Sequence, residues 1–247
     1  MNARRLSMLR CCAAMVLAPA CAANVPYYQF THNPPERTIR KVVLRPVVIP
    51  EIWKDDAPKL NDAIAARLRT ADLGIVPFEE TRSYWTEAFS AAGPLYDVRT
   101  GEPNKKAMRA VYTDYLDRLA TAGAADAVVE PAVVARVAKL SSKSAFWDGI
   151  RMRIPDTYGG KWTGTADVLS LRITVMGVDG EQVLLNFGGL EFPHEFRSKG
   201  GKLDSELRDD LFRDREQVDR AVAIALHPFV PYAEFPSRPR LYVDVPD

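Results

Sequence analysis

All three cysteines of this 247-residue chain, Cys11, Cys12 and Cys21, lie close to its N-terminus. The sequence beyond Cys21 therefore has no cysteine with which to form an internal disulfide or a thiolate metal site. Such a chain must be held together by burial of apolar side chains, and its 47% of hydrophobic residues allow a sizeable core. Its length suits one large domain or two small ones.

The segment that contains the cysteines is typical of an export signal. Arg4, Arg5 and Arg10 give it a basic start, and the apolar residues 11–20 lead to small residues around Cys21. That apolar run is about ten residues long, whereas a membrane-spanning helix needs about 20. The sequence therefore predicts a signal peptide over residues 1–20 and an exported protein.

Residues 17–21, Leu-Ala-Pro-Ala-Cys, resemble the lipobox of bacterial lipoproteins, with the leucine one position further from the cysteine than usual. The resemblance implies that Cys21 becomes the lipidated first residue. Ala22 follows it in place of an aspartate, which implies a lipid anchor on the periplasmic face of the outer membrane. Alternatively, Ala20-Cys21-Ala22 fits an ordinary cleavage site, which would leave a soluble periplasmic protein.

The charge of the chain argues against a nucleic-acid partner. The formal net charge is +1, and loss of the three leader arginines leaves the 32 acidic side chains in slight excess. A near-neutral chain without a basic block lacks the electrostatic footprint of a nucleic-acid-binding protein.

Periodicity beyond the leader predicts a single mixed-sheet α/β sandwich with the order β-α-β-α-α-β-β-β-α. The predicted strands are 41–50, 75–78, 127–137, 169–175 and 183–187. The predicted helices begin at Asp55 or Asp56, at Thr81 or Ser83, at Asn104 and at Asp204, and the last continues to His227. Right-handed crossovers make the first strands parallel, and the last two form an antiparallel hairpin at the edge.

Particular residues mark the ends and turns of these elements. Pro46 should mark a bulge or the end of the first strand, and Pro131 should interrupt the third. Asp179-Gly180 predicts a type I′ hairpin turn, whose two central residues need positive φ. The charged run 209–216 suits a solvated face of the last helix.

The flanks of the domain differ from its interior in composition. Residues 21–37 are punctuated by proline and predict a tether, or, in their first half, a strap that packs on the domain through Tyr27, Tyr28 and Phe30. The domain itself spans 38–230. Residues 231–247 predict an extended C-terminal arm that docks on the domain or on a neighbouring subunit.

The order of elements resembles the small α/β domain of periplasmic lipoproteins. The similarity rests on residues 42–46, on the helix 60–68, on 123–129 leading into the third strand, and on 169–173 with the following turn. Proteins with this domain include the curli secretion lipoprotein CsgG, the lipoprotein activator of penicillin-binding proteins and the N-terminal domain of TolB. The resemblance implies an assembly or protein-binding role in the envelope and carries no catalytic set.

The sequence offers little for metal binding or catalysis. The three histidines, His32, His194 and His227, are scattered, whereas metal ligands usually come in closely spaced sets. His227, at the end of the last helix, is interpreted as a cation favoured by the helix dipole. No G-x-S-x-G nucleophile elbow occurs, and the acidic pairs 55–56 and 79–80 lie where helix starts need acids.

One aromatic constellation is a candidate partner-binding site. Trp147, Tyr158 and Trp162 lie within residues 141–164, which we expect to form a long loop or a loose hairpin. Interface hot spots favour tryptophan and tyrosine. The alternative is that these rings are partly buried beside the core.

We therefore expect a lipid-anchored bacterial envelope protein that binds other envelope proteins or its own copies. We expect it to need no cofactor and not to be an enzyme. The alternatives are a periplasmic module that binds a small ligand and a hydrolase that acts on the cell wall.

Overall fold

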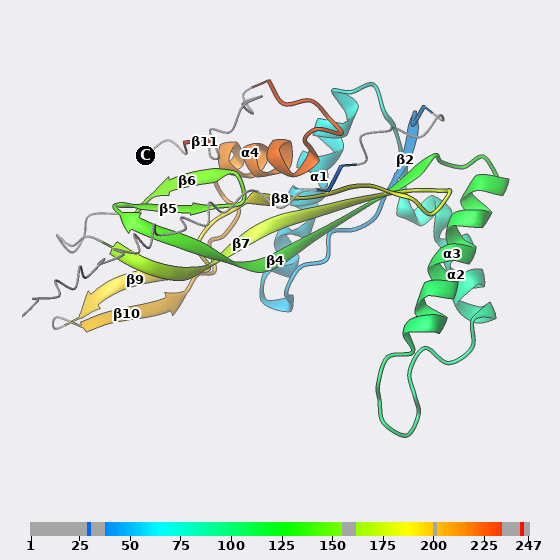
Figure 1. Ribbon diagram of the computed structural model, residues 1–247, viewed down its shortest axis with the longest axis horizontal. Coiled ribbons are helices and arrows are strands. Elements are labelled where there is room, and N and C mark those ends of the chain that lie inside the picture. The colour runs from blue at the N-terminus through cyan, green and yellow to red at the C-terminus, as the bar shows by residue number, and fades with distance from the viewer. Residues whose placement is uncertain (1–28, 31–37, 155–161, 200–201, 234–242, 245–247) are drawn as a thin grey trace, which may run out of the picture.

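The computed structural model describes residues 29–30, 38–154, 162–199, 202–233 and 243–244 (Figure 1). A mixed sheet of nine strands carries helices on both faces, and a separate two-stranded sheet lies beside it. This arrangement confirms the predicted mixed-sheet α/β sandwich. None of the described helices is long and apolar enough to span a membrane.

The strands are β1 (Gln29–Phe30), β2 (Lys41–Leu44), β3 (Gly74–Pro77), β4 (Ala127–Ser142), β5 (Ser144–Trp147), β6 (Ile150–Arg153), β7 (Trp162–Gly177), β8 (Gln182–Gly189), β9 (His194–Lys199), β10 (Lys202–Leu207) and β11 (Val243–Asp244). The helices are η1 (Glu51–Asp56), α1 (Ala57–Arg69), α2 (Phe78–Ala91), α3 (Lys105–Thr121) and α4 (Arg215–Leu226). The longest path through the main sheet is β1-β8-β7-β4-β5-β6-β11.

Three parallel strands form one end of the main sheet. β2 lies between β3 and β4, and Val42 is opposite Ile75 on one side and Ala127 on the other. Helix α1 connects β2 to β3, and α2 and α3 connect β3 to β4. Because the two crossovers run to opposite sides of β2, right-handed connections place their helices on opposite faces of the sheet. β2 ends at Leu44, so the predicted strand 41–50 is too long, and of the two alternatives for Pro46 the end of the strand holds.

The predicted interruption at Pro131 is wrong, because the 16-residue strand β4 runs through this proline without a break. Pro131 is paired with Ile173 of β7, and its carbonyl accepts a hydrogen bond from the Val48 amide at 3.0 Å. The backbone polar groups of Pro131 therefore face the side of β2, which has already ended at Leu44. The missing amide of the proline leaves no hydrogen bond of the ladder unmade there.

Two hairpins of the sheet turn on an Asp-Gly pair. Asp179-Gly180 lies between β7 and β8 as predicted, but only Gly180, at φ 82°, has a positive φ, so the turn is not type I′. The pair with two positive φ values is Asp148 (34°) and Gly149 (83°), which joins β5 to β6. The expected loop or loose hairpin over 141–164 thus contains a tight hairpin. Its residues 155–161 lie outside the described part.

The last helix begins later than predicted. Residues 202–207 form β10, which pairs antiparallel with β9 in the small sheet, so a helix from Asp204 is wrong. α4 starts after Asp214, whose carboxylate accepts a hydrogen bond from the Gln217 amide at 3.2 Å. The cap residue fixes this boundary. Leu207, the last residue of β10, is 49% exposed.

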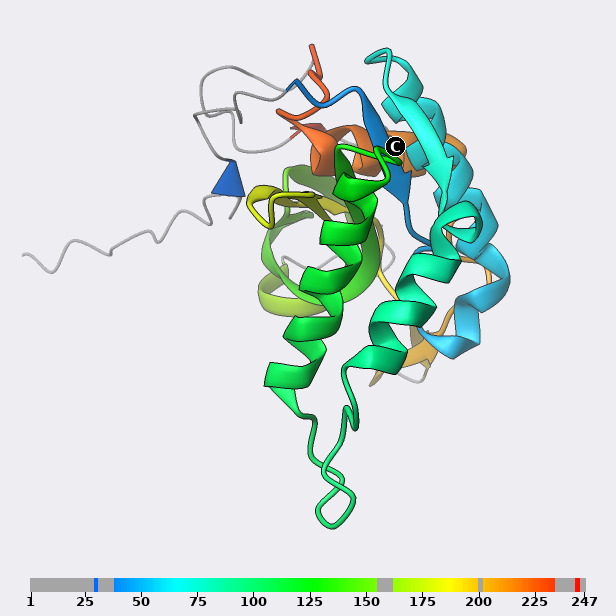
Figure 2. The same ribbon diagram turned by 90° about the vertical axis from the view of Figure 1, so that its right-hand side faces the viewer.

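Helices cover the two faces of the main sheet with separate cores. On one face, α4 packs on β7 and β8, and α1 packs on α4 and β3, through a cluster that includes Leu60, Ile64, Leu68, Val218 and Val222. On the other face, α2 and α3 pack on the ends of β2 and β4 through a cluster that includes Val43, Val111, Tyr115, Leu119 and Val128. Figure 1 shows α2 and α3 standing away from α1 and α4, and Figure 2 shows the loop that connects them projecting beyond the sheet.

Short strands from both flanks of the chain lie at the ends of the sheet path. Phe30, in the predicted tether, pairs with Leu184 of β8, which favours the strap alternative for residues 29–30. Val243 pairs in parallel with Ile150 of β6. The predicted docking of the C-terminal arm is therefore observed at β11, while residues 234–242 lie outside the described part.

Candidate functional site

Three of the predicted site residues cannot be placed as side chains. Cys21 and Tyr158 lie outside the described residues, and Trp162 is described only as the first residue of β7, paired with Ser142. Lipidation at Cys21 and partner binding by Tyr158 and Trp162 therefore remain predictions.

Trp147 is fully described and lies inside the domain. Its side chain is 1% exposed, and its Nε1 donates a hydrogen bond to the Leu169 carbonyl at 3.1 Å. The Trp147 ring lies 5.6 Å from that of Phe192, centroid to centroid. Gly189 packs so closely that a Cβ there would lie 2.8 Å from the indole nitrogen. In this conformation Trp147 fixes the β5–β6 hairpin to the sheet and presents no surface to a partner.

His227 is not the helix-end cation that the sequence suggests. It ends α4, where burial and then the nearby Arg67 guanidinium lower the pKa of its imidazole. A lowered pKa disfavours the charged form of the ring, which argues against its acting as a cation at the helix end. In the described part of the chain, no group of three or more His, Cys, Asp or Glu residues is placed to hold a metal ion.

A groove of about 670 Å³ between α1 and the start of α4 is the candidate functional site. Its apolar lining residues are Ala63, Ala66, Phe212 and Val218. Its charged lining residues are Lys59, Asp62, Arg67, Arg213, Arg215 and Asp219. An apolar lining with charged groups around it is suited to bind the side chains of a partner or the body of an amphipathic ligand.

The groove is electropositive, because four cations face two carboxylates. Arg215 is only loosely paired, at 3.9 Å from Asp219. Lys59 is paired with Asp56 at 2.6 Å, outside the groove lining. Among the described residues, Arg213 forms no ion pair within 4 Å. Arg215 and Arg213, whose charge also acts on the nearby Asp210, are therefore the cations most available to a negatively charged partner.

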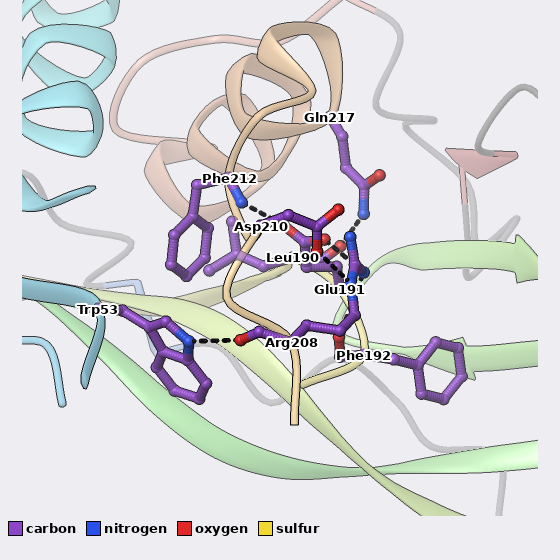
Figure 3. A network of polar contacts seen from close by, with 8 residues as sticks. All are labelled: Trp53, Leu190, Glu191, Phe192, Arg208, Asp210, Phe212 and Gln217. Atoms are coloured by element: carbon purple, nitrogen blue, oxygen red, sulfur yellow. Dashed lines mark hydrogen bonds and ion pairs between the residues drawn. The ribbon is translucent and has the colours of Figure 1, made fainter. Parts of the chain in front are cut away.

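A partly buried polar network holds residues 208–213, of which Phe212 and Arg213 form a wall of the groove (Figure 3). Glu191 accepts hydrogen bonds from the Phe212 amide at 2.6 Å and from Arg208 Nη1 at 2.9 Å. Arg208 Nε donates to Asp210 at 2.8 Å, and its carbonyl accepts from Trp53 Nε1 at 3.0 Å. The network joins η1 to the β8–β9 and β10–α4 connections, so this wall is preorganised.

The two carboxylates that pair with Arg208 have pKa values shifted in opposite directions. Burial raises the pKa of Glu191, although the Phe212 amide and the Arg208 guanidinium oppose that shift. The hydrogen bond from Arg208 lowers the pKa of Asp210, which lies at the surface. Arg208 thus binds one buried carboxylate, that of Glu191, and one surface carboxylate, that of Asp210.

Arg67 connects the groove to the start of the C-terminal arm. Its Nη2 donates a hydrogen bond to the Pro231 carbonyl at 2.6 Å, and its guanidinium carbon lies 5.4 Å from the centre of the Tyr232 ring. Its Nε is buried without a hydrogen-bond partner in the described part of the chain. The arm therefore leaves the domain directly beside the groove.

Sequence reasoning missed this groove entirely. Its lining residues fall in two segments, 59–70 and 212–219, and neither contains a motif. The run 209–216 was expected to be a solvated helix face, but residues 209–213 precede α4, and Asp210 binds Arg208. No local signal indicates that these segments meet.

Comparisons with known proteins place the chain in no family. No family model and no curated protein matches it. Among solved structures, the PelC dodecamer from Paraburkholderia phytofirmans is 14% identical with a TM-score of 0.36, covering 83% of this chain and 97% of that one. Lipoprotein GNA1162 from Neisseria meningitidis is 13% identical with a TM-score of 0.30, covering 61% of this chain and 81% of that one. These likenesses are too weak to carry a functional argument, and the finer resemblances drawn from the sequence remain predictions.

Proposed function

We propose that the protein is a lipid-anchored factor of the bacterial envelope that binds another protein and catalyses no reaction. The export signal and the lipobox-like residues before Cys21 support its location. The α1–α4 groove supports its binding role and is the observation on which the proposal rests.

The groove suits a segment of a partner protein because its two kinds of lining residue act together. Ala63, Ala66 and Val218 offer apolar contact area, and Arg213 and Arg215 offer charge to an acidic segment. The wall fixed by Glu191 and Arg208 is already in place, so binding loses little entropy in ordering it. A partner tethered in the same envelope meets the groove at high effective concentration.

A small ligand is the second candidate occupant. The volume of about 670 Å³ falls within the range of small-molecule sites, about 300–1,000 Å³. Such a ligand would carry an acidic group to meet the arginines. A second copy of the chain is a further occupant that the sequence suggests.

Capture experiments with groove variants test the proposal. Ala66→Arg obstructs the groove from an exposed position of α1, and Arg213→Glu reverses a charge beside it. We expect each to reduce the capture of a partner from detergent-solubilised envelopes at least about tenfold, as for an interface hot spot. The matched control is Arg69→Glu, an exposed α1 charge outside the groove lining.

The kind of molecule that the groove variants fail to capture distinguishes the protein-binding role from the ligand-binding role. Loss of a captured protein in both variants, with capture intact in Arg69→Glu, supports the protein-binding role. Loss of a small molecule detected by mass spectrometry supports the ligand-binding role. Capture that is equal in all variants and the unmodified chain contradicts a function for the groove.

A further inference from the structure

The loop between α2 and α3 projects from the domain and displays apolar side chains at its tip. In both views it extends beyond the sheet, away from the groove helices α1 and α4 (Figures 1 and 2). Val98 is 96% exposed and Tyr96 57% exposed. Phe89, near the end of α2, is 49% exposed. Exposed apolar groups that gather on one projection indicate a contact surface.

Hydrogen bonds hold this loop in one shape. Asp97 Oδ1 accepts from the amides of Arg99 and Thr100 at 2.8 and 2.9 Å. The Asp97 amide donates to the Glu102 carbonyl, and the Gly101 amide donates to the Asp97 carbonyl, both at 2.8 Å. The hydrogen bonds from the Thr100 and Arg99 amides to the carboxylate lower the pKa of Asp97, so the side chain stays ionised. A tip that is already ordered loses little entropy on contact.

The tip is also fixed where it begins and ends. Tyr96 forms a β-bridge with Pro103, and the Asn104 amide donates to the Leu95 carbonyl at 2.8 Å. Asn104 caps α3 by accepting from the Ala107 amide at 3.1 Å. The tip is therefore held at a set distance from the body of the domain.

Cations follow the apolar tip along the chain. Arg99 follows Val98, and Lys105, Lys106 and Arg109 lie exposed at the start of α3. Over residues 94–109 four basic side chains stand against two acidic ones, and one of those two is the hydrogen-bonded Asp97. An apolar tip with an aromatic ring and a set of cations behind it matches an anionic lipid surface, where rings and long cationic side chains settle at the headgroups.

We propose that the α2–α3 loop binds the surface of an anionic lipid bilayer, with Val98 and Tyr96 inserted at the headgroup level and Lys105 and Lys106 against the lipid phosphates. This contact is separate from the α1–α4 groove and does not depend on a partner protein. It makes the domain lie on its membrane in one orientation.

A local probe at the tip tests this contact in the full chain. Cys11→Ser, Cys12→Ser, Cys21→Ser and Val98→Cys together leave one thiol for an environment-sensitive fluorophore. The labelled protein is mixed with phosphatidylcholine vesicles that contain phosphatidylglycerol and a nitroxide-labelled lipid, and bound protein is isolated by flotation. We expect a blue-shifted emission and strong quenching at position 98.

Matched labels and variants make the result specific. The same label at Arg215→Cys, a side chain 92% exposed on α4, should float with the protein but stay unquenched. Lys105→Gln with Lys106→Gln should weaken tip insertion on the order of twenty-five-fold, because each cation near an anionic surface contributes about fivefold. High salt should also weaken tip insertion, and so should vesicles made of phosphatidylcholine without phosphatidylglycerol.

Three outcomes overturn the proposal. One is a failure of the protein to float with anionic vesicles. Another is floated protein whose label at position 98 is not quenched. The third is equal quenching at positions 98 and 215, which would mean that the tip is not the contacting surface. Each leaves the groove proposal untouched, because capture by the groove is measured in detergent.

Discussion

The two faces of the main sheet are held by different kinds of contact. On the α4 face the helix backbone itself meets the sheet, since a Cβ at Gly188 would lie 1.9 Å from the Ala221 carbonyl oxygen. On the same face, Asn186 Nδ2 donates to the carbonyls of Ile224 and His227 at 2.8 and 2.7 Å. Small residues and a buried amide thus fix α4 at close range.

On the other face, side chains make the contacts. The ring of Tyr115 lies edge-on to those of Phe78 and Trp85, at 6.5 and 5.3 Å between centroids. The Arg45 guanidinium lies 4.5 Å from the centre of the Trp85 ring and pairs with Glu130 at 2.6 Å. Side chains can repack in small steps, whereas a helix backbone in direct contact cannot. The comparison indicates that the groove wall is set more rigidly than the helices that carry the projecting loop.

The largest expected effect breaks the backbone contact on the α4 face. Gly188→Ala places a methyl group against the Ala221 carbonyl, so α4 has to move. We expect the free energy of unfolding, measured by urea denaturation, to fall by about 3 kcal/mol. The matched control is Gly74→Ala, where the added Cβ lies at an ordinary 3.5 Å from the Arg40 carbonyl. Equal losses for the two variants would contradict the close approach of α4.

The buried amide on the same face gives the next effect. Asn186→Ala removes both hydrogen bonds at the end of α4 and leaves two carbonyls without their donor, and we expect a loss of about 2 kcal/mol. Asn104→Ala removes a helix cap on the opposite face and should cost about 1 kcal/mol. Thermal unfolding of both variants checks the order. The reverse order would show that the α4 face is not the more tightly fixed one.

A smaller effect is expected from the side-chain contacts around Tyr115. Tyr115→Phe removes a hydroxyl that lies 3.0 Å from Thr81 Oγ1, while Thr81 keeps its hydrogen bond to the Phe78 carbonyl. We expect a loss of about 1 kcal/mol and no change in groove binding. Tyr96→Phe, at an exposed ring, serves as the neutral control. Loss of groove binding in Tyr115→Phe would mean that the two faces are coupled.

The smallest effect is a pH dependence of the groove wall. Because the pKa of Glu191 is raised in the folded protein, the folded state binds its proton more tightly than the unfolded state. Glu191 therefore makes the free energy of unfolding fall as pH rises from its ordinary value of 4.5 through the raised value. Glu191→Gln should remove this slope in denaturant titrations at a series of pH values. A slope that is unchanged in the variant would contradict the burial of the charge.

Local signals predicted the elements well where one residue decides the outcome. Asn104 was expected to start a helix and does so, with its side chain bound to the Ala107 amide. Pro46 was expected to mark a bulge or the end of the first strand, and β2 ends at Leu44. Proline and a capping side chain act through their own backbone neighbours, so their effect does not depend on the rest of the fold.

Signals that depend on pairing were less informative. Both Asp148-Gly149 and Asp179-Gly180 join antiparallel strands, yet only the first has two positive φ values, because strand register selects the turn type. Asp204 and Asp214 are both acceptable helix caps in sequence, and strand pairing with β9 decides against the first. The groove needs Ala63 and Val218 to line the same space, an arrangement that no local pattern contains.

The short strands at the two ends of the sheet path cover edges through which the protein could otherwise aggregate. β1 covers β8, and β11 covers β6, so segments from opposite ends of the chain occupy hydrogen-bonding edges that would otherwise be open to another molecule. Trimming by a protease at either end would uncover such an edge. These two short strands thus shield the edges of the sheet, and a truncation that removes either of them is expected to favour self-association.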